Sequence, residues 1–331
     1  MKFKHMKRDI ITNNSKKNNT ISTIFNRDYH SVKPQMNRNI SVDLLKLSMS
    51  FLVILIHYPP NLDSYLLIYI INDIVRIAVP VFFMISGFYL FKSVSEKSID
   101  KSLSKLFTIY LSWMTIYFIY FNFIKDDTPS AYYIISNVIQ GWFHLWYFPA
   151  SIMAIFIASI IKNKKTTIII TISMILLFIF YFLQLEKLSL VNIYAYRNFI
   201  FFGLPCVLIG GVLYRYEANI NRKTLFYFLI ISCPIIITWY YMFYIEKKVI
   251  LELPLTSLIF SIFVVSLVMK VNIKSSVNIG KLSTTIYLSH PIFMDVINHF
   301  NFCFILSYLM IIMMCVFLYF IVNLMNIKYI V

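Results

Sequence analysis

The sequence is poor in charged residues, and this shortage excludes a large class of proteins. Only 13% of its 331 residues are charged, whereas a soluble protein carries roughly 25%. Hydrophobic residues make up 60% of the chain, and the mean hydropathy is +0.75. This composition excludes a soluble globular enzyme and indicates a protein of the membrane.

Cysteine and acidic residues are also scarce. The four cysteines all lie inside apolar runs, with no CxxC pair and no histidine at metal-ligand spacing: Cys206, Cys233, Cys303 and Cys315. We therefore expect small buried hydrophobic side chains and neither a disulfide nor a metal site. The formal net charge is +16, but no basic patch with interleaved aromatic residues lies outside the loops, so we expect no nucleic-acid partner.

Residues 1 to 37 lack an apolar run. They hold eight Lys or Arg residues against Asp9 and Asp28, with many Asn, Ser and Thr. A signal peptide needs a hydrophobic core segment, so we expect a disordered basic tail in the cytoplasm.

Residues 38 to 331 hold ten mostly apolar segments. A helix needs about 20 such residues to span a bilayer, and somewhat fewer where other helices bury it. We predict an all-α polytopic membrane protein with about ten transmembrane helices. The expected spans lie near residues 44 to 58, 77 to 91, 106 to 124, 142 to 161, 166 to 184, 199 to 213, 225 to 244, 254 to 269, 282 to 300 and 303 to 326.

The positions of the basic residues set the orientation of these spans. With a cytoplasmic N-terminus and ten helices, only six of the 30 Lys and Arg residues fall outside: Arg76, Lys125, Lys187, Arg197, Lys247 and Lys248. Cytoplasmic loops carry an excess of Lys and Arg. We therefore predict that both termini are cytoplasmic in a multi-pass protein of the cell membrane.

The stretch from Asp43 to His57 places ionisable residues on an apolar helix. Eleven helical residues make about three turns and rise about 16 Å, so Lys46 and His57 share one face near opposite membrane surfaces. Asp43 falls near the same stripe. Ionisable groups in a membrane are costly and are functional candidates: His57 can accept a proton, and Lys46 can bind a phosphate. The alternatives are a membrane anchor for Lys46, paired with Asp43, and a solvated interfacial position for His57.

Ser86 and Gly87 lie in the middle of an expected helix, in a chain with only six glycines. Small residues allow membrane helices to approach closely. We expect packing here rather than catalysis.

Two stretches on the outer side are suited to a substrate. His144 stands in GWFHLWYF, where aromatic faces suit a sugar or a quaternary amine. Trp142, Trp146 and Tyr147 also fit an interfacial aromatic belt. Arg197 stands where basic residues are rare, and it suits either an anionic acceptor or an ion pair with an outer acid.

His290 lies in mid-membrane, with Tyr287 one turn earlier. A buried polar residue in lipid needs a partner. Participation in a site and membership of a packed hydrogen-bond network therefore both stay open for His290.

Four motifs in this order resemble acyltransferase family 3. They are D-x-x-K/R with a histidine eleven residues after the basic position, then FFxxSGF, HLWY and IYLSHP, at residues 43 to 57, 82 to 88, 144 to 147 and 286 to 291. Together they cover about residues 40 to 326. Many members of the family carry Arg where this chain has Lys46. The RNFIFFGLP segment and the lysine are also similar to the branch that contains the membrane domain of vancomycin-resistance serine racemases.

The resemblance implies a bacterial ten-helix O-acyltransferase in the lipid bilayer, with no bound cofactor. The expected reaction moves an acyl group, usually acetyl, from cytoplasmic acyl-CoA to a hydroxyl of an extracytoplasmic glycan or other envelope acceptor. In that scheme Lys46 binds the donor, and His57 activates the acceptor with Asp43 and His290 as further catalytic candidates. Four residues would contact the acceptor: His144, Trp146, Arg197 and Tyr287.

The same polar stripe also fits a permease-like protein. Such a protein would move a small polar solute, such as serine, or a surface polysaccharide without covalent change. Coenzyme A binding favours the enzyme, and uptake at unchanged solute mass favours the permease.

Overall fold

The structure is a computed structural model that describes most of the chain. The described residues are 38 to 124, 137 to 186, 192 to 221, 223 and 224, 226 and 227, 230 to 233, 250 to 271, 273 to 275, 279 to 300, 302 to 325 and 327. The expected tail of residues 1 to 37 and most of the expected span near residues 225 to 244 lie outside them.

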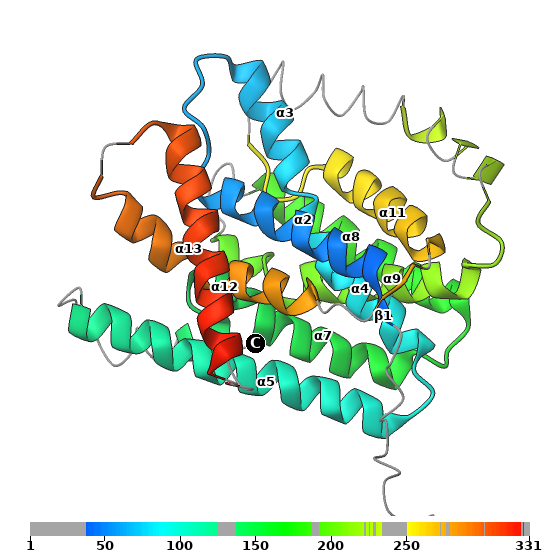
Figure 1. The fold of residues 1–331 in the computed structure, drawn as a ribbon. Helices are drawn as coiled ribbons and strands as arrows, with labels where there is room; N and C mark the ends of the chain where they lie inside the picture. The colour runs from blue at the N-terminus through cyan, green and yellow to red at the C-terminus, as the bar shows by residue number, and fades with distance from the viewer. Residues whose placement is uncertain are drawn as a thin grey trace, which may run out of the picture.

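The described chain folds as a bundle of helices (Figure 1). Its α-helices are α2 (Ile40–His57), α3 (Tyr65–Val75), α4 (Ala78–Lys92), α5 (Glu96–Ile119), α7 (Tyr147–Ile161), α8 (Thr166–Glu186), α9 (Leu204–Tyr216), α11 (Leu255–Lys270), α12 (Ile279–Ile297) and α13 (Phe304–Leu324). Shorter turns of other helix types are η1 (Tyr120–Ile124), η2 (Phe143–Trp146), η3 (Ile193–Ala195) and η4 (Phe199–Gly203). Two two-residue strands, β1 (Arg38–Asn39) and β2 (Lys274–Ser275), pair antiparallel and tie the start of α2 to the loop before α12.

Among the residues that the structure describes, six helical stretches are long and apolar enough to cross a membrane, which confirms a multi-pass membrane protein. They are Ile40–His57, Leu66–Lys92, Phe143–Ile161, Thr166–Leu185, Phe199–Tyr216 and Phe304–Leu324. The expected number of ten remains a prediction. Helices also stand at the spans expected near 106 to 124, 254 to 269 and 282 to 300, but α5 opens with a charged stretch, α12 holds many polar residues, and α11 has only 16 residues.

Helix α3 was not expected from the sequence. It has only 11 residues, fewer than a span requires, and it leads directly into α4. Together they form the apolar run Leu66–Lys92, so the second span is longer than predicted.

The centre of the bundle is the close pair α4 and α9. A Cβ atom on Gly87 would lie 1.8 Å from the Val207 carbonyl oxygen, and one on Gly210 would lie 2.0 Å from the Met84 carbonyl oxygen. Each backbone therefore rests directly on the other helix. The expected packing role of Gly87 is confirmed.

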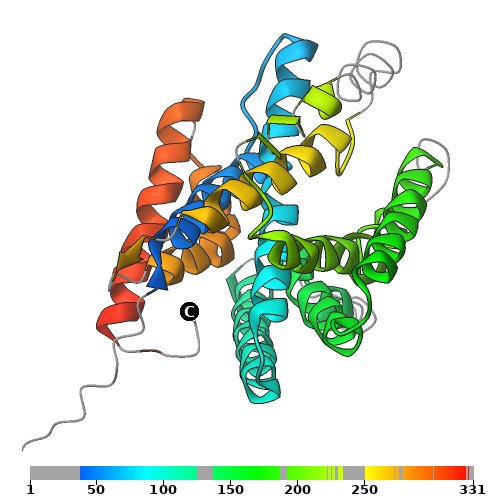
Figure 2. The same cartoon turned by 90° about the vertical axis from the view of Figure 1, so that its right-hand side faces the viewer.

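Other helices pack around this pair. Ser50 of α2 donates to the Ser283 carbonyl of α12 at 2.9 Å. Figure 1 shows α5 alongside α7, and both views show α13 crossing α12 steeply (Figure 2). In the apolar windows of α8 and α13 only 28% and 22% of the residues are buried. Large apolar side chains such as Phe178 and Phe317 are exposed there, as expected of helices that face lipid.

The two ends of the bundle carry the two sets of basic residues that the sequence places on opposite sides. At one end Arg76 and Arg197 meet the same acid, Glu252. At the other end Lys162 donates to the Ser93 carbonyl at 3.2 Å, and Arg215 donates to the Thr166 hydroxyl at 2.7 Å and to the Lys162 carbonyl. The side of the membrane that each end faces remains a prediction.

Candidate active site

Three histidines from distant parts of the chain meet at one point. The ring centroids of His144 and His290 are 4.9 Å apart, those of His57 and His290 are 5.4 Å apart, and those of His57 and His144 are 6.4 Å apart. His57 ends α2 and is exposed, whereas His144 in η2 and His290 in α12 are 2% and 0% exposed. His57 is therefore the most accessible of the three histidines, and the two buried imidazoles lie behind it.

The hydrogen bonds of His290 fix its tautomer. Its Nδ1 lies 2.8 Å from the Tyr287 carbonyl oxygen and 3.2 Å from the Ile286 carbonyl oxygen. A carbonyl can only accept, so Nδ1 carries the proton and Nε2 is the basic nitrogen. That Nε2 is buried and makes no hydrogen bond within the described residues.

His144 is held by its surroundings more than by its own nitrogens. The Leu288 carbonyl lies near its ring, but neither ring nitrogen makes a hydrogen bond of good geometry within the described chain. The Tyr287 hydroxyl donates to the backbone carbonyl of His144 at 2.8 Å. The Tyr117 ring meets the imidazole edge-on at 5.4 Å, and its hydroxyl donates to the Leu288 carbonyl at 2.8 Å.

The turn that carries His144 depends on Gly141. This glycine has a φ of +88°, a conformation that residues with a Cβ atom rarely adopt. A Cβ here would also lie 2.4 Å from the backbone of Trp146. The turn is therefore closed tightly against η2.

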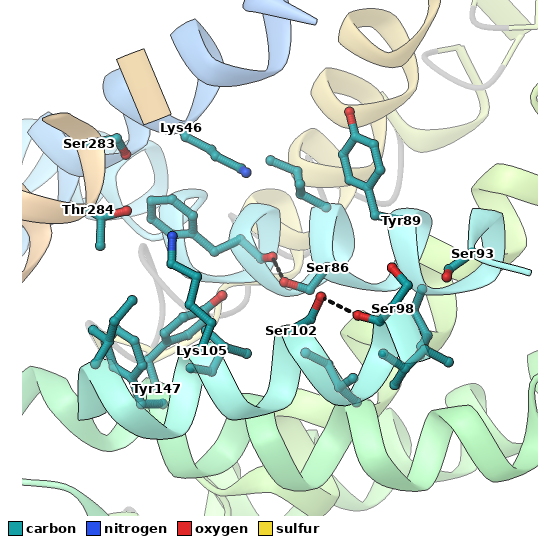
Figure 3. Close-up of a pocket in the computed structure, with 18 of the residues that line it drawn as sticks. Lys46, Ser86, Tyr89, Ser93, Ser98, Ser102, Lys105, Tyr147, Ser283 and Thr284 are labelled. Carbon is teal, nitrogen blue, oxygen red and sulfur yellow. Dashed lines mark hydrogen bonds between the residues drawn. The ribbon is translucent and has the colours of Figure 1, made fainter. Parts of the chain in front are cut away.

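A cavity of about 600 Å³ opens at the Lys46 end of α2, a volume within the range of small-molecule sites. Lys46 from α2 and Lys105 from α5 extend into the same space (Figure 3). Lys92 at the end of α4 also lines it. Many of the other lining residues carry hydroxyl groups: Ser86, Tyr89, Ser93, Ser98, Ser102, Tyr147, Ser283, Thr284 and Tyr287.

Tyr287 connects this cavity with the histidines. It lines the cavity, and its ring lies 5.4 Å from that of His144 and 6.3 Å from that of His290. A molecule that filled the cavity would therefore extend from the lysines to Tyr287, and only the Tyr287 ring would separate it from the histidine cluster.

The other side of the cluster carries charged residues. Glu252 Oε1 lies 2.7 Å from Arg76 Nη1 and 3.4 Å from Arg197 Nη1. The Arg197 guanidinium also lies over the Trp146 ring, 5.2 Å from its centroid. Within the described part of the chain, no group of three or more His, Cys, Asp or Glu residues is arranged to hold a metal ion.

The structure brings together most of the residues expected at the site. His57, His144, His290 and Tyr287 form one cluster, and Lys46 lies on the same helix as His57, as predicted. Asp43 does not join them. It is buried in the first turn of α2, and fourteen residues of helix place it about 21 Å from His57.

Some expectations need correction. Trp142 and Trp146 are 4% and 9% exposed, so they pack inside the bundle and do not form an interfacial belt. Arg197 forms the ion pair that was one of its two predicted roles. Cys206 and Cys315 are buried as expected, but Cys233 and Cys303 are exposed.

Four residues at the site were not selected from the sequence. Lys105 is one of several lysines at the charged start of α5, and Tyr117 is one of 24 tyrosines, so neither carries a distinguishing signal. Arg76 and Glu252 are ionisable residues in segments that the expected topology places outside, and that position was the only signal available for them.

A family model described as an acyltransferase domain matches residues 39 to 325, which include every residue of the site. The chain belongs to acyltransferase family 3. Membership confirms the resemblance drawn from the four motifs. The protein is thus a multi-pass membrane protein with an acyltransferase domain.

Two relatives of this family 3 protein carry racemase names. A serine/alanine racemase of Enterococcus gallinarum is 30% identical over 130 residues, which are 35% of this chain and 18% of that protein. An amino-acid racemase of Enterococcus faecalis is 24% identical over 298 residues, which are 79% of this chain and 42% of that protein. The chain therefore spans less than half the length of either relative. No solved structure matches the chain.

Proposed function

We propose that this protein transfers an acyl group, typically acetyl, from coenzyme A to a hydroxyl of an acceptor on the outer side of the membrane. The observation that carries this proposal is the continuity between the cavity and the histidines. Tyr287 lines the cavity and contacts both buried imidazoles. A donor in the cavity and an acceptor beside His57 would then meet at the histidine cluster.

The cavity suits the donor in charge and shape. The phosphates of coenzyme A are anionic, and Lys46, Lys92 and Lys105 all line the space. A single lysine binds phosphate as a point charge, without the two-pronged contact that an arginine makes. Many family members have an arginine at the position of Lys46. In this chain Lys105 supplies a second point charge in the same cavity. The pantetheine arm would run along the apolar and hydroxyl-bearing wall toward Tyr287.

The reaction needs a base for the acceptor hydroxyl and a proton for the sulfur of the leaving coenzyme A. His57 accepts the proton of the acceptor hydroxyl as its oxygen attacks the thioester carbonyl. The new C–O bond forms, the C–S bond breaks, and the sulfur of coenzyme A takes up a proton. The products are an ester on the acceptor and free coenzyme A. His290, with Nε2 as its basic nitrogen, lies beside His57 and can share the proton.

Coenzyme A binding to the full-length protein in lipid nanodiscs tests the donor half of this proposal. Lys46→Ala and Lys105→Ala should each raise the Kd about tenfold, a loss of about 1.4 kcal/mol. Lys164→Ala is the matched control, because Lys164 is an exposed lysine near the same end that does not line the cavity. Wild-type affinity in both cavity variants would contradict the assignment of the cavity to the donor.

A second candidate function is transport of a small polar solute such as serine. The two relatives are named as amino-acid racemases, which points to an amino acid as the solute of such a protein; the names themselves state no transport. A permease has no requirement for coenzyme A and leaves its solute chemically unchanged. Donor binding and the mass of the product therefore separate the two functions.

A further inference from the structure

The ion-pair cluster beside His57 joins two guanidinium groups to one carboxylate among the described residues. Arg76 and Arg197 both contact Glu252, so two cations share one carboxylate. The three side chains are only 21%, 20% and 11% exposed for Arg76, Arg197 and Glu252. Charged groups at such partly buried positions are costly unless groups of opposite charge lie beside them.

Each member of the cluster is held in place. Asn72 accepts a hydrogen bond from Arg76 Nε at 3.3 Å and donates to the Leu251 carbonyl at 3.3 Å. Buried Gln184 bonds both backbone groups of Leu253, at 2.9 and 3.3 Å. The backbone on either side of Glu252 is therefore fixed, and the guanidinium groups are positioned in advance.

Arg197 is held by an aromatic ring and has a hydrogen-bond donor available for a ligand. Its guanidinium lies over Trp146, and its Nε is buried without a hydrogen-bond partner among the described residues. Trp146 belongs to η2, the same turn that carries His144, whose ring adjoins that of His57. His57 also interacts electrostatically with all three charged groups of the cluster, those of Arg76, Arg197 and Glu252.

Resting on the function proposed above, we propose that Arg76 and Arg197 bind a carboxylate on the acceptor while His57 faces its hydroxyl. The site would then select anionic hydroxyl compounds over neutral ones. Glu252 supplies the counter-charge when no acceptor is bound and weakens acceptor binding through repulsion. Removal of Glu252 should therefore strengthen carboxylate binding, whereas removal of either arginine should weaken it.

The test uses the full-length protein in lipid nanodiscs and does not require the natural acceptor. Diethyl pyrocarbonate modifies exposed His57, and mass spectrometry measures the rate of this modification. The rate is compared in the presence of two pairs of protecting compounds: glycolate and its neutral analogue glycolamide, and glucuronate and its neutral analogue glucose. Each carboxylate should protect at a concentration about tenfold lower than its neutral partner. Arg76→Gln and Arg197→Gln should abolish that preference, Arg197→Lys should retain part of it, and Glu252→Gln should increase it.

Arg215→Gln is the matched control. Arg215 lies over Phe91 at 5.3 Å, much as Arg197 lies over Trp146, but at the other end of the bundle. It should leave the preference unchanged. Equal protection by carboxylates and neutral compounds, absence of protection by both, or weaker protection in Glu252→Gln would overturn the proposal. Failure of the donor proposal would appear as absent coenzyme A binding, which this assay does not use.

Discussion

Tyr287 contacts both the cavity at the Lys46 end of α2 and the two buried histidines. Its hydroxyl holds the backbone of His144, and its ring lines the cavity. The Tyr287→Phe change removes the hydrogen bond and keeps the ring. We expect kcat to fall about tenfold or more because His144 shifts, while the Kd for coenzyme A stays the same. The melting temperature should fall only slightly, since one hydrogen bond contributes about 1 kcal/mol.

Tyr308→Phe is the control for this substitution. Tyr308 donates to the Phe51 carbonyl at 3.1 Å, so the variant loses a comparable bond outside the histidine cluster. It should match Tyr287→Phe in melting temperature and retain wild-type kcat. Equal kcat in the two variants would show that Tyr287 does not position the site.

The sequence identifies each histidine of the site, but it does not predict that the three lie close together. His57, His144 and His290 each stand out as polar residues in apolar surroundings. Their approach to within 4.9 to 6.4 Å depends on how α2, η2 and α12 pack, and no local pattern encodes that. Lys105 could not be selected because a lysine at a helix start is ordinary.

At the scale of elements, the contact between α4 and α9 depends on two glycines. Gly87→Ala places a methyl group against the Val207 carbonyl, and backbone atoms cannot move aside as a flexible side chain can. We expect a loss of about 3 kcal/mol or more in the free energy of unfolding, seen as a lower melting temperature in detergent and less monodisperse protein.

Gly203→Ala gives the graded comparison. A Cβ there would first meet the ring of Phe83 at 3.1 Å, and a side chain can shift by a few tenths of an ångström. The loss should be about 1 kcal/mol. If the two variants were equally stable, close backbone approach would not be what joins α4 to α9.

Most helices follow from apolar runs of the right length. The exception is α3, whose 11 residues are too few for a span and too apolar for a typical loop. The close approach of α4 and α9 is visible in the sequence only as small residues in the middle of helices, and the partner helix cannot be named without the fold.

At the scale of the whole molecule, the account requires the cavity to face the cytoplasm, because coenzyme A is supplied there. In a cysteine-free background, Asn61→Cys should react with a membrane-impermeant maleimide in intact cells, and Lys164→Cys should react only after the cells are opened. Both positions are exposed and lie in connections that the positive-inside rule places on opposite sides. The reverse pattern would place the cavity on the outer side, where coenzyme A is not supplied, and would contradict its assignment to the donor.

The most direct test of acyl transfer by the histidine cluster uses inside-out vesicles from cells that carry the gene, so that the natural acceptor is present. Acetyl-coenzyme A labelled in the acetyl group is added outside. We predict an alkali-labile label on an acceptor inside the vesicles, at a rate that falls at least about 100-fold in His57→Ala. His299→Ala, which changes an exposed histidine outside the cluster, should match wild type. Wild-type labelling in His57→Ala would contradict the account.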